Sequence, residues 1–301
     1  MNLDSPHTTV STIAARGLAP RWKRFWRDPV VMFALVVVIV LTLMAIFAPQ
    51  LAAKNPDINF PEGLSDAGAP IAPNSSFWFG TDLLGRDLFS RILYGARVSL
   101  LIGVLANSAA VLIGVFVGLI AGFFGGWTGT LLMRFTDLMT AFPVLLLAIA
   151  LTAILTPSLW IVALVIALLN WVSLARVVYG QVLGLKSREY VTAAESLGAS
   201  QTRVLLRHVL PGLLPTAVVW GTLGISTSVM LEATLSFLGV GVQPPTPSWG
   251  GIINESQSYF TLAPWLVAFP GIMILLTALS FNLLGEGLRE AIDPSSRRAG
   301  L

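Results

Sequence analysis

The clearest chemical signal in this sequence is a polar, basic stretch between two long apolar segments. It covers residues 189–211 and reads EYVTAAESLGASQTRVLLRHVLP. Residues 189–197 have a helical composition, Gly198 is suited to end that helix, and residues 200–208 are suited to begin another. Pro211 then fits the first turn of the helix that follows. A compact helix–glycine–helix unit beside apolar segments favours docking of a soluble partner, and an ordinary polar loop is the alternative.

The residues expected to form this docking loop combine charge with a small, flat apolar side. The positive charge comes from arginine and histidine, and the flat side from alanine, leucine and glycine. The candidate residues are Glu189, Ala193, Ala194, Gly198, Arg203, Arg207, His208, Leu210 and Pro211.

Residues that commonly carry out catalysis are scarce elsewhere in the chain. Cysteine is absent, and the two histidines, His7 and His208, both lie outside the apolar segments. The phosphate-binding pattern G-x-x-x-x-G-K-[ST] does not occur. Metal chemistry and acid–base catalysis therefore lack their residues, so we expect no enzyme activity, no metal site and no directly bound cofactor.

One carboxylate interrupts a long apolar segment near the C-terminal third. Ala217, Gly221, Gly224, Ser228 and Glu232 fall on one face of a helix at steps of four, three, four and four residues. Ionisable groups inside membrane spans are costly and usually face a cavity. We predict that Glu232, Ser228 and Gly224 line a water-filled path. The alternative is that Glu232 lies near the outer membrane surface and bonds neighbouring backbone.

The composition indicates that most of the chain lies within a membrane. Of the 301 residues 55% are hydrophobic and 11% charged, whereas soluble domains carry about 25% charged residues. We predict an all-α polytopic protein with six transmembrane helices, since six apolar segments can cross about 30 Å of hydrocarbon. They cover residues 30–48, 98–122, 131–154, 158–175, 212–238 and 264–285.

Lysine and arginine set the expected orientation, because they concentrate in cytoplasmic loops. With the N-terminus inside, 14 of the 18 basic residues lie on the inner side and only Lys54, Arg86, Arg91 and Arg97 lie outside. This predicts a cytoplasmic N-terminal arm (1–29), a first span (30–48) and a periplasmic loop (49–97). A five-helix core (98–285) with a cytoplasmic loop at 176–211 follows, then a cytoplasmic tail (286–301). The net charge of +3 gives no indication of nucleic-acid binding.

The end of the periplasmic loop carries charges of alternating sign. Asp82, Arg86, Asp87 and Arg91 can pair locally, and leucine and isoleucine lie between them. We therefore expect residues 82–95 to form an amphipathic helix on the outer membrane surface.

The second apolar segment has a stripe of small residues, Ala106, Ala110, Gly114, Gly118 and Gly122. Small residues at this spacing allow helix backbones to approach closely in lipid. Packing within the chain is favoured over a contact between subunits.

The third segment begins with two opposite charges and contains a proline. Arg134 and Asp137 are three residues apart on one helix face and are predicted to form a structural ion pair, with a role in a transport pathway as the alternative. Pro143 predicts a kink in this segment.

Several blocks of the sequence resemble the C-type permease subunits of ABC importers for dipeptides, oligopeptides and nickel. They are RDP before the first span, GTDLLGRDLFSRILYGARVSL, MRFTD, the loop around Gly198, LSFLGVGVQPPTPSWG and NLLGEGLREAIDP, which together cover about residues 24–294. The spacing from Ala193 through Gly198 to Pro211 is similar to the EAA loop of these permeases, the coupling helix that rests in a groove of the ATPase subunit. Thr192 and His208 depart from that motif, in which a glutamate and a branched apolar residue are usual.

The resemblance implies a type I importer fold in a bacterial inner membrane. It also implies a B-type permease subunit as heterodimer partner, two ATPase subunits that use ATP, and a periplasmic solute-binding protein. The expected function is import of di- or oligopeptides, with a nickel chelate or glutathione as alternative cargo. An ion-coupled secondary transporter is an alternative of another class, but it would need ionisable groups near the membrane midplane.

Overall fold

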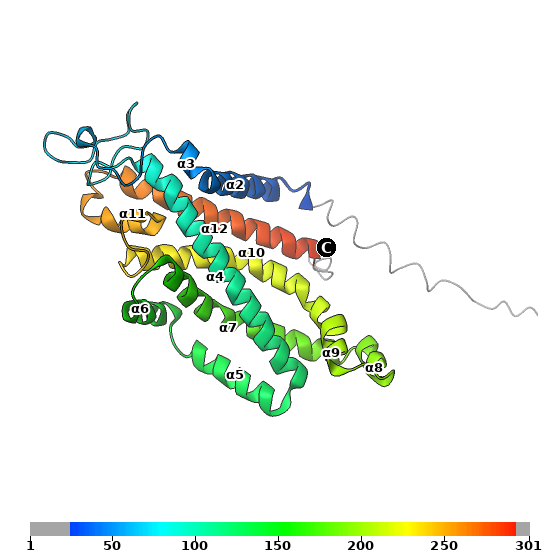
Figure 1. Ribbon diagram of the computed structural model, residues 1–301. Helices are drawn as coiled ribbons and strands as arrows, with labels where there is room; N and C mark the ends of the chain where they lie inside the picture. Colours follow the sequence, from blue (N-terminus) through cyan, green and yellow to red (C-terminus); the bar gives the residue numbers. More distant parts are fainter. Residues whose placement is uncertain (1–24, 293–301) are drawn as a thin grey trace, which may run out of the picture.

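The computed structural model describes residues 25–292, and this part of the chain is built from helices (Figure 1). No strand occurs within these residues, where isolated β-bridges pair Leu64 with Pro70 and Thr81 with Asp87. The expected all-α class is confirmed. Most of the predicted N-terminal arm and the end of the predicted tail, including Arg16, Arg21, Lys23, Arg24, Arg297 and Arg298, lie outside the described residues.

Five helices of the described part are long and apolar enough to cross a membrane. They are α2 (Pro29–Ile46), α4 (Leu88–Phe124), α7 (Leu159–Lys186), the helical run Gln201–Phe237 that ends in α10 (Leu210–Phe237), and α12 (Trp265–Ile292). A sixth crossing exists if α5 (Gly126–Thr140) and α6 (Val144–Ile154) are taken together. The shorter elements are α3 (Ala48–Leu51), η1 (Pro61–Gly63), α8 (Glu189–Ser196), α9 (Gln201–Val204), η2 (Leu205–Val209), α11 (Trp249–Glu255) and η3 (Gln257–Tyr259).

The predicted third span is broken rather than kinked. Helices α5 and α6 meet at an angle of 87° around residues 141–143. Pro143 lacks the N–H that would continue the helix and disfavours a helical backbone at Phe142. The prediction of a single, merely kinked helix over 131–154 was therefore wrong.

The helices extend beyond the apolar segments that the sequence revealed. Helix α4 has 37 residues and is about 55 Å long, well over the thickness of a hydrocarbon core. Helix α7 runs to Lys186, about three turns past the predicted end of its span at residue 175. Hydropathy locates the part of a helix that lipid surrounds, whereas the helix itself continues into polar surroundings.

The stripe of small residues in α4 packs against α7 within the same chain. A Cβ atom at Gly114 would lie 2.8 Å from the backbone oxygen of Trp171, and one at Gly122 would lie 2.7 Å from Cβ of Val182. Gly118, between them, faces the backbone oxygen of Ala175 still more closely. The favoured interpretation of this stripe, packing within the chain, is confirmed.

The end of the predicted periplasmic loop is buried rather than spread on a surface. Residues 82–87 form a turn, helix α4 begins only at Leu88, and Arg91 is 1% exposed. The local pairing is present, because Nε of Arg86 lies 2.6 Å from a carboxylate oxygen of Asp82. Both Arg86 and Arg91 also reach Glu255 of α11, at 2.6 and 3.0 Å. The predicted amphipathic surface helix over 82–95 was wrong, since these charges pair with a residue far away in the sequence.

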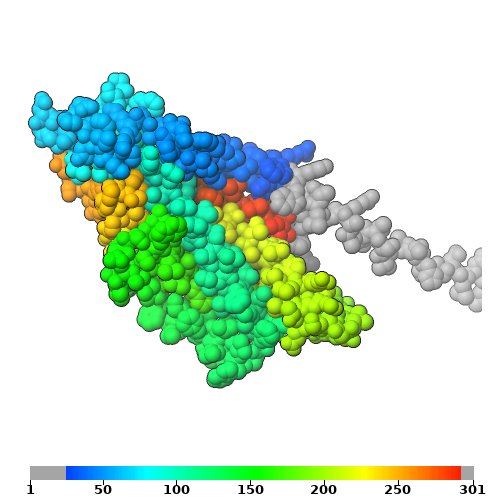
Figure 2. All heavy atoms as spheres, viewed as in Figure 1, coloured from blue at the N-terminus to red at the C-terminus, as the bar shows by residue number. Residues whose placement is uncertain are grey.

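The two ends of the bundle carry different structures. Residues 49–87 and α11 gather at one end, and α8 and α9 lie at the opposite end with the start of α2 and the end of α12 (Figure 1). We call α8, α9 and η2 together (residues 189–209) the docking unit. In the space-filling view this yellow-green unit projects from the bundle (Figure 2). The helices therefore hold the candidate docking loop well away from the long loop at 49–87.

Candidate docking site

The docking unit is anchored by three valines that point into the bundle. Val191 of α8, Val204 of α9 and Val209 of η2 are fully buried in one cluster with side chains of α4 and α7. The ammonium group of Lys186, at the end of α7, donates to the backbone oxygen of Phe123 at 2.6 Å. The unit is thus packed onto the ends of α4 and α7 rather than hanging free.

Gly198 ends helix α8 in the way that the sequence predicted. Its φ of +83° is in the left-handed region, which favours glycine. Its N–H donates to Glu195 O at 2.9 Å, and the N–H of Ala199 donates to Ala194 O at 3.0 Å. These bonds satisfy carbonyl groups at the end of α8 and reverse the chain direction.

Helix α9 continues into the membrane-crossing helix without an interruption. Ser200 caps α9 by accepting from the N–H of Arg203 at 3.4 Å. A π-helical turn, η2, then joins α9 to α10, and Pro211 lies in the first turn of α10. Pro211 has the predicted position, but it does not separate the unit from α10. The backbone from α9 to α10 is therefore one uninterrupted helical stretch.

The outward side of the unit combines apolar and basic groups. Leu197, beside Gly198, is 89% exposed, and Tyr190 is 49% exposed. Among the candidate residues, Glu189, Ala193, Gly198, Arg203, Arg207 and Pro211 are exposed, and Ala194, His208 and Leu210 are partly buried. The rings of Tyr190 and His208 approach to 6.5 Å. The structure thus brings these residues together on one protruding unit.

Sequence reasoning missed the residues that fix this unit in place. Val191, Val204 and Val209 are separated by 13 and 5 residues, so no single helical period connects them. It also missed the exposed Tyr190. An aromatic residue next to the expected flat apolar side could have indicated its place on the docking surface.

The polar stripe of α10 faces neighbouring helices of the same chain. The carboxylate of Glu232 is fully buried and accepts from the hydroxyls of Ser99 on α4 and Ser236 on α10, both at 2.8 Å. Asn170 of α7 donates to the hydroxyl of Ser228 at 3.1 Å.

Polar contact between α10 and α4 continues one to two turns nearer the docking unit. Gly224 leaves room for Asn107 of α4, and the side-chain amide of Asn107 donates to Gly221 O. In this structure Glu232 and Ser228 have no surface open to a path, so the prediction that they line one is not supported. The alternative of backbone bonding at Glu232 is also inaccurate, since its partners are side-chain hydroxyls.

The predicted ion pair in α5 is weaker than a second pair that the sequence did not suggest. Arg134 and Asp137 approach only to 4.0 Å, with side chains that are 80% and 55% exposed. Asp137 lies closer to Arg176 of α7, at 3.1 Å, and Arg176 also donates to the hydroxyl of Thr140. Asp137 therefore connects α5 to α7, and exposed pairs of this kind contribute little to stability.

A cavity of about 660 Å³ lies between α7, α10 and α12 on the side of the bundle that carries the docking unit. Its walls are largely apolar, with Trp220 and Val219 among them, and its polar groups are Gln181, Thr216 and Arg289. Gln181 donates to the hydroxyl of Thr216 at 2.8 Å, which joins α7 to α10 across the cavity wall. The size is within the usual range for small-molecule sites.

The sequence matches two family models over most of its length. Residues 114–298 match the model described as binding-protein-dependent transport system inner membrane component. Residues 19–70 match the N-terminal transmembrane domain of oligopeptide transport permease C. The first match covers the docking unit, helix α7 and the end of α4 on which the unit packs.

Curated relatives are similar over nearly the whole chain. The dipeptide transport system permease protein DppC of Alkalihalophilus pseudofirmus is 40% identical over 92% of this chain and 89% of its own length. The glutathione transport system permease protein GsiD of Escherichia coli O6:K15:H31 is 44% identical over 91% of this chain and 89% of its own length. GsiD of Shigella boydii has the same identity and coverage.

Proposed function

This chain belongs to the family of binding-protein-dependent transport system inner membrane components, and we propose that it is the permease subunit of an ATP-driven importer of di- or oligopeptides. The observation that carries the proposal is the continuous path from α9 through η2 into α10. It supports a subunit that converts movement at a docked partner into movement of a membrane helix.

The proposed docking partner is one of two ATPase subunits, which bind and hydrolyse ATP while this chain does neither. The outward side of the unit offers Leu197 as an apolar knob next to the tight turn at Gly198. A side chain that is 89% exposed in the isolated chain gains stabilisation when a partner buries it, by roughly 2 kcal/mol for a leucine.

The cavity between α7, α10 and α12 is the proposed inner part of the transport path. Unlike the stripe at Glu232, it is open and has polar groups on its wall, including Gln181, Thr216 and Arg289. It also borders α10, the helix that the docking unit would move. The wall of a path for peptides needs such groups, because peptides carry charged ends and polar amides.

The cargo is proposed from the relatives, whose names refer to dipeptides and glutathione. Both are short peptides, so a small peptide is the shared chemistry. Glutathione is the second candidate, and the 44% identity to GsiD favours testing it alongside dipeptides.

The remaining partners and the placement follow from the same proposal. We propose a heterodimer with a B-type permease subunit, a periplasmic solute-binding protein at the end with residues 49–87, and a bacterial inner membrane. The N- and C-termini and residues 176–211 are placed in the cytoplasm, because 14 of the 18 basic residues would then lie on the inner side.

Photo-crosslinking from the docking unit tests the proposal. A photoreactive amino acid replaces Leu197 in the chain co-expressed with its neighbouring ATPase, permease and binding-protein genes. We expect crosslinks to an ATPase subunit. The matched control is the same replacement at Leu262, which is 70% exposed and follows α11. Crosslinking of the ATPase from Leu262 but not from Leu197 would overturn the docking assignment.

Uptake by the same cells tests the cargo. Labelled dipeptide and labelled glutathione are supplied to cells that lack other importers for them, with and without the complete transporter. Transport of at least one compound is expected, and it should be lost in Leu197→Asp, whose level in the membrane should match that of Leu262→Asp. Transport of neither compound would contradict the peptide assignment without affecting the crosslinking result.

A further inference from the structure

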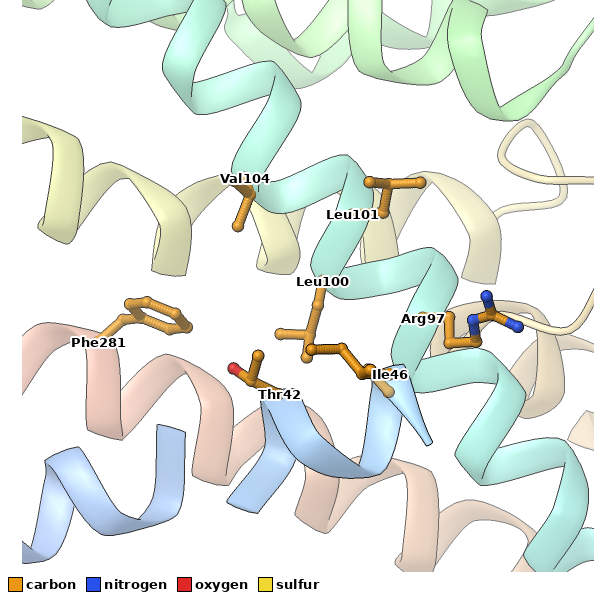
Figure 3. A pocket seen from close by; sticks show the side chains of 8 residues that line it. Thr42, Ile46, Arg97, Leu100, Leu101, Val104 and Phe281 are labelled. Atoms are coloured by element: carbon orange, nitrogen blue, oxygen red, sulfur yellow. The ribbon is translucent and has the colours of Figure 1, made fainter. Parts of the chain in front are cut away.

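A second groove lies on the opposite side of the molecule from the docking unit and has different chemistry. It has a volume of about 410 Å³ and is bordered by α2, α4 and α12 (Figure 3). Its walls are apolar except at Thr42 and Arg97. The side chains that line it include Ile46, Arg97, Leu100, Leu101, Val104 and Phe281.

The groove lies at the depth where a lipid headgroup meets the hydrocarbon region. Arg97 lines it together with Ile46, the last residue of α2, and just precedes the apolar segment that begins at residue 98. From Arg97 to Val104 the groove follows α4 for about 10 Å, which is about two thirds of one leaflet's hydrocarbon. A charged group thus stands at the polar end of an apolar channel that continues into the membrane.

Arg97 is available for a ligand. It is exposed, and no residue of the range 25–292 forms an ion pair or hydrogen bond with its guanidinium group. This differs from Arg86 and Arg91, which are buried and paired with Glu255. No carboxylate borders the groove, so its charge is that of a single cation.

The walls have the form that an acyl chain needs. Leu101 is 43% exposed and Val104 is 42% exposed, which leaves apolar surface open along the groove. A single chain of methylene groups can lie along these exposed apolar side chains, with its charged headgroup at Arg97.

We propose that this groove binds one phospholipid, with its phosphate at Arg97 and one acyl chain along α4 between α2 and α12. A lipid with a net negative headgroup is preferred, since a single unpaired cation meets it. A basic residue near a membrane surface contributes about 1 kcal/mol toward anionic lipid, which corresponds to about fivefold in affinity. The site would hold α2 against the rest of the bundle through a lipid.

Native mass spectrometry of the full chain in detergent tests the proposal, with phosphatidylglycerol and phosphatidylethanolamine added in turn. The wild-type chain should retain one phosphatidylglycerol molecule, with about fivefold preference over phosphatidylethanolamine. Arg97→Gln should remove the preference, and Val104→Trp should reduce binding of both lipids by filling the groove. Arg134→Gln is the matched control, because it removes another exposed arginine far from the groove. Elution as a single species establishes that each variant is folded.

The position of the lipid is tested separately with a phosphatidylglycerol that carries a photoreactive group in its acyl chain. Labelling of α2 and α4 peptides around Ile46 and Val104 is expected, and it should disappear in Val104→Trp. Equal retention of both lipids by the wild type and Arg97→Gln would overturn the proposal. A second result would also overturn it: the partner permease displaces the lipid and can be crosslinked to position 97. The groove would then be a protein interface.

Discussion

At the scale of single residues, Gly198 is the position where backbone geometry and the proposed docking meet. A Cβ atom there would meet nothing within 4 Å in this chain, so a side chain costs only the left-handed backbone conformation, roughly 1 kcal/mol. We expect Gly198→Asp to reach the membrane at normal levels and to reduce peptide uptake at least tenfold. The new side chain would project into the partner.

Gly68 provides the matched control for this substitution. It has a φ of +71° and also meets nothing within 4 Å, but it lies in the segment at the other end of the molecule. Gly68→Asp therefore carries the same backbone strain without touching the docking unit, and its level in the membrane should match that of Gly198→Asp. Normal uptake by Gly198→Asp at normal expression would contradict the docking role.

Glu232 is expected to act as a structural residue. Its carboxylate accepts hydrogen bonds from Ser99 and Ser236, and glutamine keeps its size and an acceptor oxygen. Glu232→Gln should leave uptake within about twofold, equally for peptides with free and with blocked amino termini. Glu232→Leu should lower the free energy of unfolding by about 1–3 kcal/mol, because buried hydroxyls lose their acceptor.

Thermal unfolding in detergent and uptake by cells check this prediction together. A selective loss of uptake for free-amino peptides in Glu232→Gln would show that the charge contacts the cargo. It would also mean that the buried position of Glu232 changes during transport.

The sequence was sufficient to place Glu232 on a polar face of a helix, but not to decide what that face contacts. Small and polar residues in a membrane helix fit both a water-filled path and close packing with hydrogen bonds between helices. The deciding partner, Ser99, lies 133 residues away on α4. Gly198 was predictable because its role depends only on its immediate neighbours in the chain.

At the scale of elements, the contact between α4 and α7 holds the base of the docking unit. Gly118 faces the backbone of Ala175, and a larger side chain there would separate the helices. We expect Gly118→Leu to reduce strongly the amount of monodisperse protein extracted from membranes, because overpacking of this kind costs about 1–3 kcal/mol or more. Gly184→Leu on α7 is the control, since a Cβ atom at Gly184 meets nothing within 4 Å. Equal yields of the two variants would show that the close approach does not support folding.

Hydropathy and periodicity predicted the long helices because each depends on a local run of residues. They did not predict that α5 and α6 meet at 87°, since Pro143 allows anything from a kink to a complete break. The continuous connection of α9 to α10 was also missed. The pattern predicts a separate helix that begins near Pro211, whereas a proline in a first helical turn also permits a π turn to precede it.

At the scale of the whole molecule, the arrangement of the helices separates two ends that should face different compartments. Ser75 lies in the segment at 49–87 and Ser200 lies between α8 and α9, at the opposite end, and both are exposed. The distribution of lysine and arginine predicts that Ser75 lies outside and Ser200 in the cytoplasm. Because the chain contains no cysteine, a single introduced thiol can be labelled without background.

Ser75→Cys should therefore react with a membrane-impermeant maleimide in intact spheroplasts, and Ser200→Cys should react only after the membrane is disrupted. Labelling of both after disruption establishes that each thiol is accessible, as their exposure in the structure requires. The opposite pattern would place the docking unit outside the cell. ATPase subunits could not reach it there, and the proposed importer would be excluded even though the helices and the family assignment stood.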